Sequence, residues 1–357
     1  MVPPAQGPSP ITVIGDGLAG TLLALSLARR GAAVRLIGRG PDTATALSYG
    51  AIAPGAPSRA WRRLERLHGP LGWHSSGLVF HDARPGLPHL LAALSQRLPV
   101  PLAHIDTPTW MAACPQALAA AGVQHLARRV AALEAKPQGG WLLDLEPTDP
   151  AGSPSRAVEV LETTTVVLAA GAHCRTLWPD LPAQLRHSWA GVLLVGADAP
   201  ANPWLDQARR GRIVQPRRWQ RPALEAASAT PSAEPRWIVD AGMAPWGEGL
   251  VVGQISWLPE TTALGPSQLL QPPDPPWMEG RLREGLGQLD PQLATLSAPY
   301  RQVPVSFCTD GQPLATPVDG APGLWAFAGF SAAFSIVPAM AERLAERLMA
   351  QGSHHGQ

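Results

Sequence analysis

Apolar and polar positions at the start of the chain follow a pattern that predicts a β-α-β unit. Residues 11–14 are an apolar run rich in β-branched side chains, which is typical of a short strand. After a glycine-rich break, apolar positions over residues 22–28 predict a helix that ends at Gly31. Residues 34–37 form another apolar run and predict the second strand.

The next part of the chain alternates between predicted helices and strands. Small residues fill positions 48–54, where a backbone could pass close to a flat ligand. The run at 165–171 is apolar and ends in small residues, which is typical of a strand buried on both faces of a parallel sheet. The other elements predicted here are helices at residues 60–67, 87–98 and 110–121, a strand at 77–80, and a β-meander at 123–126, 130–134, 141–145 and 158–161.

The pattern in the second half of the chain predicts an antiparallel sheet. After it comes another strand, small-residue turn and helix, as at the start of the chain. A strand at 324–328, a small-residue turn at 329–335 and a final amphipathic helix end the pattern. We interpret residues 221–235 and 261–276 as linkers or surface insertions. The other elements predicted here are strands at 190–196, 211–215, 236–240, 249–257 and 301–307, a loop at 241–248 and a helix at 278–289.

Three glycines between the first strand and the first helix predict a dinucleotide site. Gly15, Gly17 and Gly20 have G-x-G-x-x-G spacing, in which the first permits a tight turn, the second a close pyrophosphate and the third close helix packing. The helix that begins near Leu18 and Ala19 would face the phosphates with unpaired N–H groups.

One feature of such sites is missing. The second strand often ends in an Asp or Glu that binds the adenosine ribose, whereas Gly38 and Arg39 stand here. An Arg at this place could pair with a 2′-phosphate, which keeps NADP open as the dinucleotide.

Composition excludes several classes of protein. The 357 residues carry a net charge of +1, which gives no indication of nucleic-acid or anionic-membrane binding. No run reaches the length of about 18 apolar residues that a membrane span needs, and the proline-rich first ten residues do not resemble a signal peptide. The three cysteines are far apart, so we expect no zinc site and a cytoplasmic location.

The order of these parts resembles the FAD-dependent family of D-amino acid oxidase, glycine oxidase and sarcosine oxidase. The stretches that carry the resemblance extend over nearly the whole chain: VIGDGLAG, SYGAIAP, LARRVAALEA, VVLAAGA, GLVVGQIS, TDGQPLATPVDG and LWAFAGFSAAFS. The resemblance implies an α/β fold, α+β overall, in which a Rossmann-like FAD-binding domain is combined with a discontinuous antiparallel-sheet substrate domain. It places the first domain at residues 1–72, 107–185 and 306–357 and the second at 73–106 and 186–305.

The resemblance also implies the residues that contact FAD. Backbone N–H groups near the terminal turn would face the flavin, Ser48 the pyrophosphate and Val130 the adenine, and Gly171 would lie close to the dinucleotide. The full set expected at the cofactor is Gly15, Gly17, Leu18, Ala19, Gly20, Gly38, Arg39, Ser48, Gly50, Ala51, Ile52, Val130, Ala170, Gly171, Gly329, Phe330, Ser331, Ala332 and Ala333.

The same resemblance implies oxidation of a C–N bond in a small amine or amino acid, by hydride transfer to FAD. The Arg that often binds the substrate carboxylate in this family would fall near Val305, and the nearest Arg is Arg301. Arg301 is therefore one candidate substrate contact. His74 is the other, because the stretch from Trp73 to Gly77 enters the region of the substrate sheet. The single lysine, Lys136, lies in a predicted turn, so a lysine beside the flavin is not expected.

Two alternatives stay open at this point. The missing Arg near Val305 and the missing flavin-side lysine would suit an FAD-binding protein that has lost catalysis and serves assembly or regulation. Arg39 would suit an NADP-dependent reductase, although the small-residue turn near the C-terminus favours FAD. The sequence indicates no substrate, electron acceptor or oligomeric state.

Overall fold

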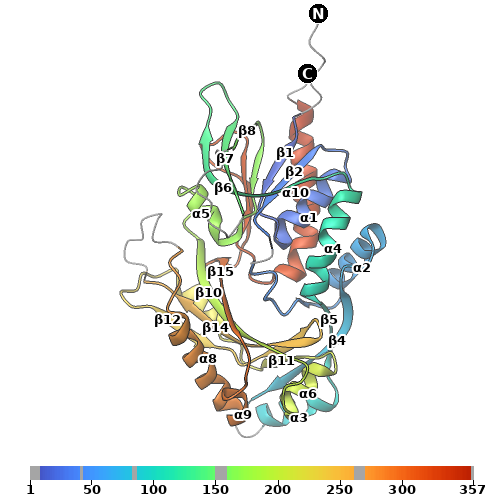
Figure 1. Ribbon diagram of the computed structural model, residues 1–357, viewed down its shortest axis with the longest axis vertical. Coiled ribbons are helices and arrows are strands. Elements are labelled where there is room, and N and C mark those ends of the chain that lie inside the picture. The colour runs from blue at the N-terminus through green and yellow to red at the C-terminus, as the bar shows by residue number, and fades with distance from the viewer. Residues whose placement is uncertain (1–8, 41–42, 83–86, 149–158, 261–269, 355–357) are drawn as a thin grey trace, which may run out of the picture.

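Two β-sheets, one above the other, organise the molecule (Figure 1). The computed structural model describes residues 9–40, 43–82, 87–148, 159–260 and 270–354, so the proline-rich leader, the turn near 149–158 and the insertion near 261–269 lie outside the described residues. The expected α/β architecture is confirmed.

The first sheet has a parallel centre. Its strand order is β16-β17-β9-β1-β2-β6-β7-β8, and every pair from β17 to β6 is parallel. The side chains of the three central strands are almost fully buried, as the apolar runs predict. The strands are β1 (Ile11–Ile14), β2 (Val34–Gly38), β6 (Gln124–Ala135), β7 (Trp141–Pro147), β8 (Glu159–Thr163), β9 (Val166–Leu168), β16 (Leu314–Pro317) and β17 (Leu324–Ala328).

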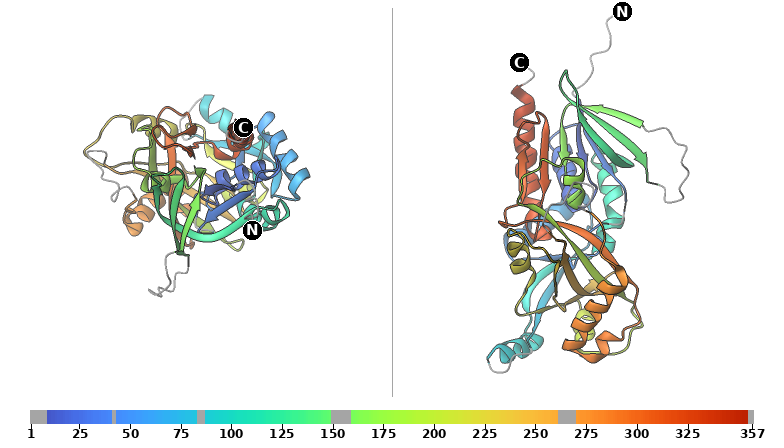
Figure 2. Two further views of the ribbon diagram at one scale, coloured as in Figure 1. Left: turned by 90° about the horizontal axis from the view of Figure 1, so that it is seen from above. Right: turned by 90° about the vertical axis from the view of Figure 1, so that its left-hand side faces the viewer.

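Helices cover one face of the parallel part of this sheet. The meander of β6, β7 and β8 packs on the other face (Figure 2). The helices are α1 (Leu18–Ala28), α2 (Ala56–His68), α4 (Thr107–Ala120) and α10 (Ala333–His354). Alternate residues of β1 point to opposite layers, so Val13 packs on the helices and Ile14 packs on β6 and β7. The meander differs from our prediction, because 123–126 and 130–134 are one strand, β6, whose register shifts between Val130 and Ala132.

The second sheet is mixed rather than antiparallel throughout. Its order is β15-β10-β14-β13-β11-β4-β5-β3, and β11 runs parallel to β4. The predicted loop 241–248 contains strand β13, which forms a hairpin with β14. The strands are β3 (Ala51–Ile52), β4 (Trp73–His81), β5 (Val100–Ile105), β10 (Leu185–Val195), β11 (Ile213–Pro216), β12 (Arg236–Val239), β13 (Met243–Trp246), β14 (Gly249–Leu258) and β15 (Tyr300–Cys308).

Helices α6 (Pro203–Arg209) and α8 (Pro275–Leu289) cover the outer face of the second sheet, where Leu205, Met278, Leu282 and Leu286 are buried. Helix α7 (Arg221–Ala227) corrects our interpretation of 221–235 as a linker. Its Leu224 packs on Leu258 and Phe307, and the Asp240 carboxylate accepts the N–H groups of Gln220 and Arg221, so burial and a backbone anchor hold this helix. Local composition gave no sign of either contact. The remaining helices are α3 (Leu87–Arg97), α5 (Cys174–Leu177), α9 (Pro291–Ala294) and the short η1 (Gly171–His173).

The expected domain limits stay a prediction. Most strands of the first sheet fall within the ranges expected for the first domain, and most strands of the second sheet fall within 73–106 and 186–305. Strand β3 lies within 1–72, yet it pairs with β5 of the second sheet. Among the described helices, none is long and apolar enough to cross a membrane.

Trp61 fastens the chain after the first β-α-β unit to the C-terminal helix. Its Nε1 donates a 2.6 Å hydrogen bond to the carbonyl of Phe334, its ring stacks on the ring of Phe334, and Trp110 meets it edge to face. The side chain is fully buried. Two segments that are more than 270 residues apart in the sequence are thereby held together.

Replacing Trp61 with Phe should destabilise the protein by about 1–3 kcal/mol, because the Phe334 carbonyl would lose its buried donor. Chemical denaturation of the purified variant would measure this change. The control is Trp219→Phe, since Trp219 is 51% exposed and should tolerate the change. Equal stability of the two variants would contradict the role given to Trp61.

Candidate cofactor and substrate site

The three glycines of the opening loop do different work in the structure. A Cβ at Gly15 would come closer than 3.0 Å to the backbone of Ala169, and a Cβ at Gly20 would meet the carbonyl of Gly15. Gly17 is different, because its φ is −69° and a Cβ there would only touch Thr45 Oγ1 at 3.3 Å. The protein itself therefore requires glycine at 15 and 20, whereas the space at 17 suits a ligand that approaches the backbone.

The N-terminus of α1 points to the same loop. Thr45 Oγ1 accepts the N–H of Leu18 at 3.0 Å, and Gly17 at the N-cap offers no side chain. The N–H groups of Ala19 and Gly20 come next in the first turn, where an α-helix has no internal acceptor. This end of α1 fits the phosphate groups of a dinucleotide.

A loop anchored at Ala46 follows the second strand. The Ala46 carbonyl accepts hydrogen bonds from Thr107 Oγ1 of α4 at 2.9 Å and from Trp246 Nε1 of β13 at 2.7 Å. Ser48 Oγ accepts the N–H of Gly50, which has φ of 62° and packs against the Ile105 carbonyl. In β3, Ile52 is buried and Ala51 is exposed, so Ala51 presents its face to the outside of the sheet.

The C-terminal turn lies against this loop and against α7. Ser335 Oγ accepts the N–H of Ala53 at 2.9 Å, and Ser331 Oγ donates to the Glu225 carboxylate at 2.9 Å. Phe330 packs edge to face on Phe327 at the end of β17. The turn expected at the flavin, including Ala332 and Ala333, is thus held from both sheets.

Other expected cofactor residues gather at the carboxyl ends of the parallel strands. Val130 is buried in the same apolar cluster as Ile14 and Ile37, and Ala170 packs against that cluster. Gly171 has φ of 58°, and a Cβ there would meet nothing within 4 Å. Ligands of open parallel sheets bind beyond the carboxyl ends of the strands, which is where these residues lie.

Arg301 and His74 are not brought together. Arg301 is exposed on β15, where Nη1 donates to the neighbouring Tyr300 carbonyl at 3.2 Å. His74 is exposed on β4 and stacks on His104 at 5.3 Å between ring centroids. Four strands separate β15 from β4, which is a distance of about 24 Å at about 4.8 Å per strand. One small substrate cannot contact both side chains.

Lys136 and Cys308 have structural partners. Lys136 forms an ion pair with Glu162 next to the β6–β7 turn. Cys308 is buried beside Gly329, and burial together with Asp310 raises the pKa of its thiol to about 11. The thiol is therefore protonated at neutral pH, and no described group of three His, Cys, Asp or Glu residues could hold a metal ion.

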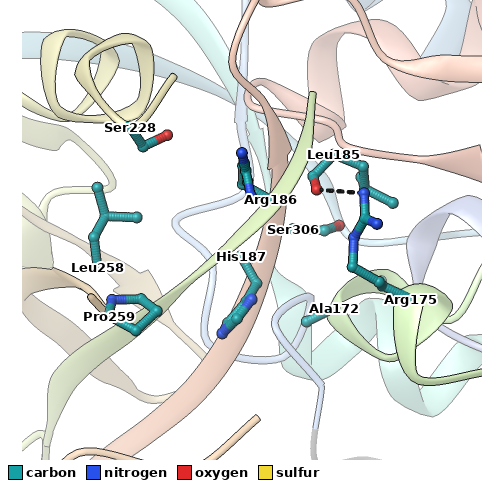
Figure 3. A pocket seen from close by; sticks show the side chains of 10 residues that line it. Ala172, Arg175, Leu185, Arg186, His187, Ser228, Leu258, Pro259 and Ser306 are labelled. Atoms are coloured by element: carbon teal, nitrogen blue, oxygen red, sulfur yellow. Dashed lines mark hydrogen bonds between the residues drawn. The ribbon is translucent and has the colours of Figure 1, made fainter. Parts of the chain in front are cut away.

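A cleft that the sequence did not indicate opens between β10 and η1. The space within it, open solvent included, is about 540 Å³ (Figure 3). Three cationic or potentially cationic side chains line it, and the described lining residues include no acidic one. The lining residues are Gly171, Ala172, Arg175, Leu185, Arg186, His187, Ser228, Leu258, Pro259 and Ser306.

Arg186 is the unpartnered cation of this cleft. Arg175 donates to the carbonyls of Pro179, Pro182 and Leu185, so its guanidinium is used by the fold. The Nε of Arg186 is buried without a hydrogen-bond partner in the described part of the chain. Ser188 Oγ, two residues further along β10, is also buried without a partner there.

Strand pairing relates these two side chains to Val305. Ser188 lies opposite Val305, and Arg186 lies opposite Phe307, in the antiparallel pair of β10 with β15. Paired residues of antiparallel strands point to the same face, so Arg186 and Ser188 lie beside the position near Val305 at which the family resemblance implies an Arg. Little in the sequence pointed to Arg186, because it precedes the apolar run from which we predicted strand 190–196.

The charge around the cleft alters His187. Burial and the positive charges of Arg175 and Arg186 lower the pKa of His187 to about 4. The imidazole is therefore neutral at pH 7, and it can accept a hydrogen bond.

Comparison with known proteins identifies relatives at the level of family and fold. A family model described as FAD dependent oxidoreductase (DAO) matches residues 98–347. No curated protein sequence matches the chain.

Solved structures with this fold are numerous. Glycine oxidase from Geobacillus kaustophilus has a TM-score of 0.60 and 15% identity, with 95% of each chain covered. L-Amino acid deaminase from Proteus myxofaciens has a TM-score of 0.61 and 14% identity over 97% of this chain and 91% of the other. Iminodiacetate oxidase from Chelativorans sp. BNC1 has a TM-score of 0.59 and 16% identity, with 95% of each chain covered. At these identities the likeness shows the fold.

Gly17→Ala should give a folded protein that binds FAD much more weakly. The added Cβ requires only a small shift of the Thr45 side chain, but it fills the space beside the helix N-terminus where a pyrophosphate would approach. Fluorescence titration of the stripped full chain with FAD measures the affinity. Gly280→Ala is the matched control, because Gly280 lies in α8 with nothing within 4 Å of a Cβ. Unchanged FAD affinity of Gly17→Ala would exclude the loop as the pyrophosphate site.

The stability of the protein should fall as the pH is lowered from about 6.5 to about 4. Burial is the main cause that lowers the pKa values of His104, His173 and His187 to about 4. A His side chain in the unfolded protein has a pKa near 6.5. Over this window the unfolded state binds more protons than the folded state, so each group reduces stability on acidification by on the order of 1–3 kcal/mol.

Denaturant melts of His187→Gln between pH 4 and pH 8 would test this. The variant should lose part of the acid sensitivity, because Gln does not take up a proton in the unfolded state. The exposed Arg301 provides the control, and Arg301→Gln should keep the pH dependence of the parent. Parallel pH profiles for all three proteins would refute the assignment.

Proposed function

Because the chain belongs to the FAD dependent oxidoreductase family, we propose that it oxidises the C–N bond of an amino acid whose carboxylate is bound by Arg186. The chain is an FAD-dependent oxidoreductase and FAD is its cofactor. The proposal adds the class of substrate and the residues that recognise it. Solved structures that share the fold are named for glycine, iminodiacetate and L-amino acids, all of which carry carboxylates.

The observation that carries the proposal is the unpaired Arg186. A buried guanidinium N–H without an acceptor costs free energy, so a site that retains one has a ligand to repay that cost. The absence of an acidic side chain among the described lining residues favours an anion. A carboxylate fits Arg better than any neutral group, because two N–H donors of the guanidinium can reach its two oxygens.

The cleft also contains groups suited to the rest of an amino acid. Leu185, Leu258 and Pro259 contribute apolar side chains to its lining. His187 is neutral and can accept a hydrogen bond from the substrate amine. FAD, when bound, supplies the acceptor for the hydride that leaves the carbon next to the amine. Arg186 would hold the substrate in a fixed orientation for that transfer.

The two candidates from the sequence, Arg301 and His74, fit this assignment less well. Both side chains are exposed, and they lie too far apart for one small substrate to contact both. The idea of an FAD-binding protein without catalysis rested on the lack of an Arg near Val305 and of a lysine beside the flavin. Arg186 on the neighbouring strand weakens the first reason, because it brings a cation to the same face of the sheet.

Arg186→Gln should weaken carboxylate binding by about 10- to 100-fold while FAD is retained, because a charge-assisted bidentate contact would be lost. The measurement is a titration of the holoenzyme with anthranilate, followed by the change in flavin absorbance. Arg281→Gln, a substitution of a half-exposed Arg on α8, serves as the control. Arg301→Gln in the same titration compares the two candidate cations directly.

A second measurement tests the reaction itself. Anaerobic mixing with a panel of amino acids, and with the matching amines that lack the carboxylate, should bleach the flavin only with the amino acids. Bleaching by amines alone would refute the proposed substrate class. Loss of FAD from Arg186→Gln would mean that the cleft binds a phosphate of the cofactor instead.

A further inference from the structure

The side chain of Asp16 occupies the place of the acidic residue that is missing from the end of β2. Asp16 stands between Gly15 and Gly17, directly after β1, and Gly38 ends β2. A Cβ built on Gly38 would come closer than 3.0 Å to Cβ, Cγ and Oδ2 of Asp16. The glycine at position 38 and the aspartate at position 16 are therefore linked, because only glycine at 38 leaves room for the Asp16 carboxylate.

The structure holds this carboxylate through one of its oxygens. Asp16 Oδ2 accepts the N–H of Gly40 at 3.3 Å and lies 3.4 Å from Nε2 of His125 at the start of β6. In the described residues no hydrogen bond uses Oδ1. The side chain is 11% exposed, so the carboxylate lies at the inner edge of the crevice and keeps one oxygen available.

The position lies on the route of the cofactor. On one side is the loop at Gly17, where we place the pyrophosphate, and on the other is β6, which carries Val130, the residue expected at the adenine. Strands β1, β2 and β6 end or pass at this edge of the sheet. The part of a dinucleotide between the pyrophosphate and the adenine is the adenosine ribose.

We propose that Asp16 binds the 2′- and 3′-hydroxyl groups of the adenosine ribose of FAD, in place of an acidic residue at position 38. The inference depends on the assignment of FAD and is independent of the amino-acid substrate. A carboxylate accepts hydrogen bonds from a pair of neighbouring hydroxyls, whereas it repels a 2′-phosphate. Asp16 therefore also selects against NADP, although Arg39 is exposed nearby.

The first test measures the affinity of the stripped full chain for ADP and for 2′-deoxy-ADP by calorimetry. The parent protein should bind ADP about 10-fold more tightly, because 2′-deoxy-ADP lacks one of the two hydroxyls. In Asp16→Ala this preference should disappear, and FAD affinity should fall by about 10- to 100-fold. An unchanged preference for ADP in the variant would overturn the proposal.

His125→Gln is the matched control for a purely structural role. It removes the partner of Asp16 but leaves the carboxylate, so it should keep the preference for ADP. If His125→Gln and Asp16→Ala lose the same FAD affinity and neither changes the ratio of ADP to 2′-deoxy-ADP, Asp16 only shapes the loop and the proposal is wrong.

A swap of the two positions gives an independent test. Gly38→Glu alone should lose FAD, because its Cβ collides with Asp16. In the double variant Asp16→Gly/Gly38→Glu, the glycine at 16 removes the clash and the glutamate at the end of β2 supplies a carboxylate. FAD binding and the preference for ADP should therefore both recover. Failure of a folded double variant to regain the preference would contradict the inference.

Discussion

Helix α1 can lie against β1 and β9 only because positions 15 and 20 have no side chains. A Cβ at Gly20 would meet the Gly15 carbonyl, and a Cβ at Gly15 would meet the backbone of Ala169. This close contact buries most of α1 against the sheet and directs its N-terminus to the crevice beyond the strands. Packing and cofactor binding thus depend on the same few atoms of backbone.

Contacts between distant segments hold the rest of the site around that crevice. The loop after β2 is fixed through the Ala46 carbonyl, which accepts from Thr107 and Trp246. The C-terminal turn is fixed through Ser331 and Ser335, and Trp61 clamps the start of α10. Each bond joins two segments that are far apart in the sequence, so the crevice is built from both halves of the chain.

Unsatisfied polar groups mark where ligands are needed. Buried polar atoms normally have partners, because desolvation without a hydrogen bond is costly. Arg186 Nε departs from that rule in the cleft between β10 and η1, where burial and positive charge also lower the pKa of His187. Asp16 keeps a carboxylate at the edge of a second part of the crevice. By their chemistry, the cleft at Arg186 suits an anion and the carboxylate of Asp16 suits hydroxyl groups.

The sequence determined the features whose cause is local. The glycine spacing at 15, 17 and 20, the buried strand at 165–171 and the strand-turn-helix at the C-terminus are written in apolar periodicity and in residues with special backbone freedom. These signals can be read without knowing which other segment of the chain packs nearby, because they arise from the backbone sterics and the burial of one short segment.

Tertiary structure decided what depends on two distant segments at once. Helix α7 exists because Leu224 finds Phe307 and Leu258, and β13 exists because β14 pairs with it. The role proposed for Arg186 depends on its register with β15, and the role proposed for Asp16 depends on the missing side chain at Gly38. Such relations are absent from the linear sequence, because strand register and steric vacancy arise only when separate parts of the chain pack together.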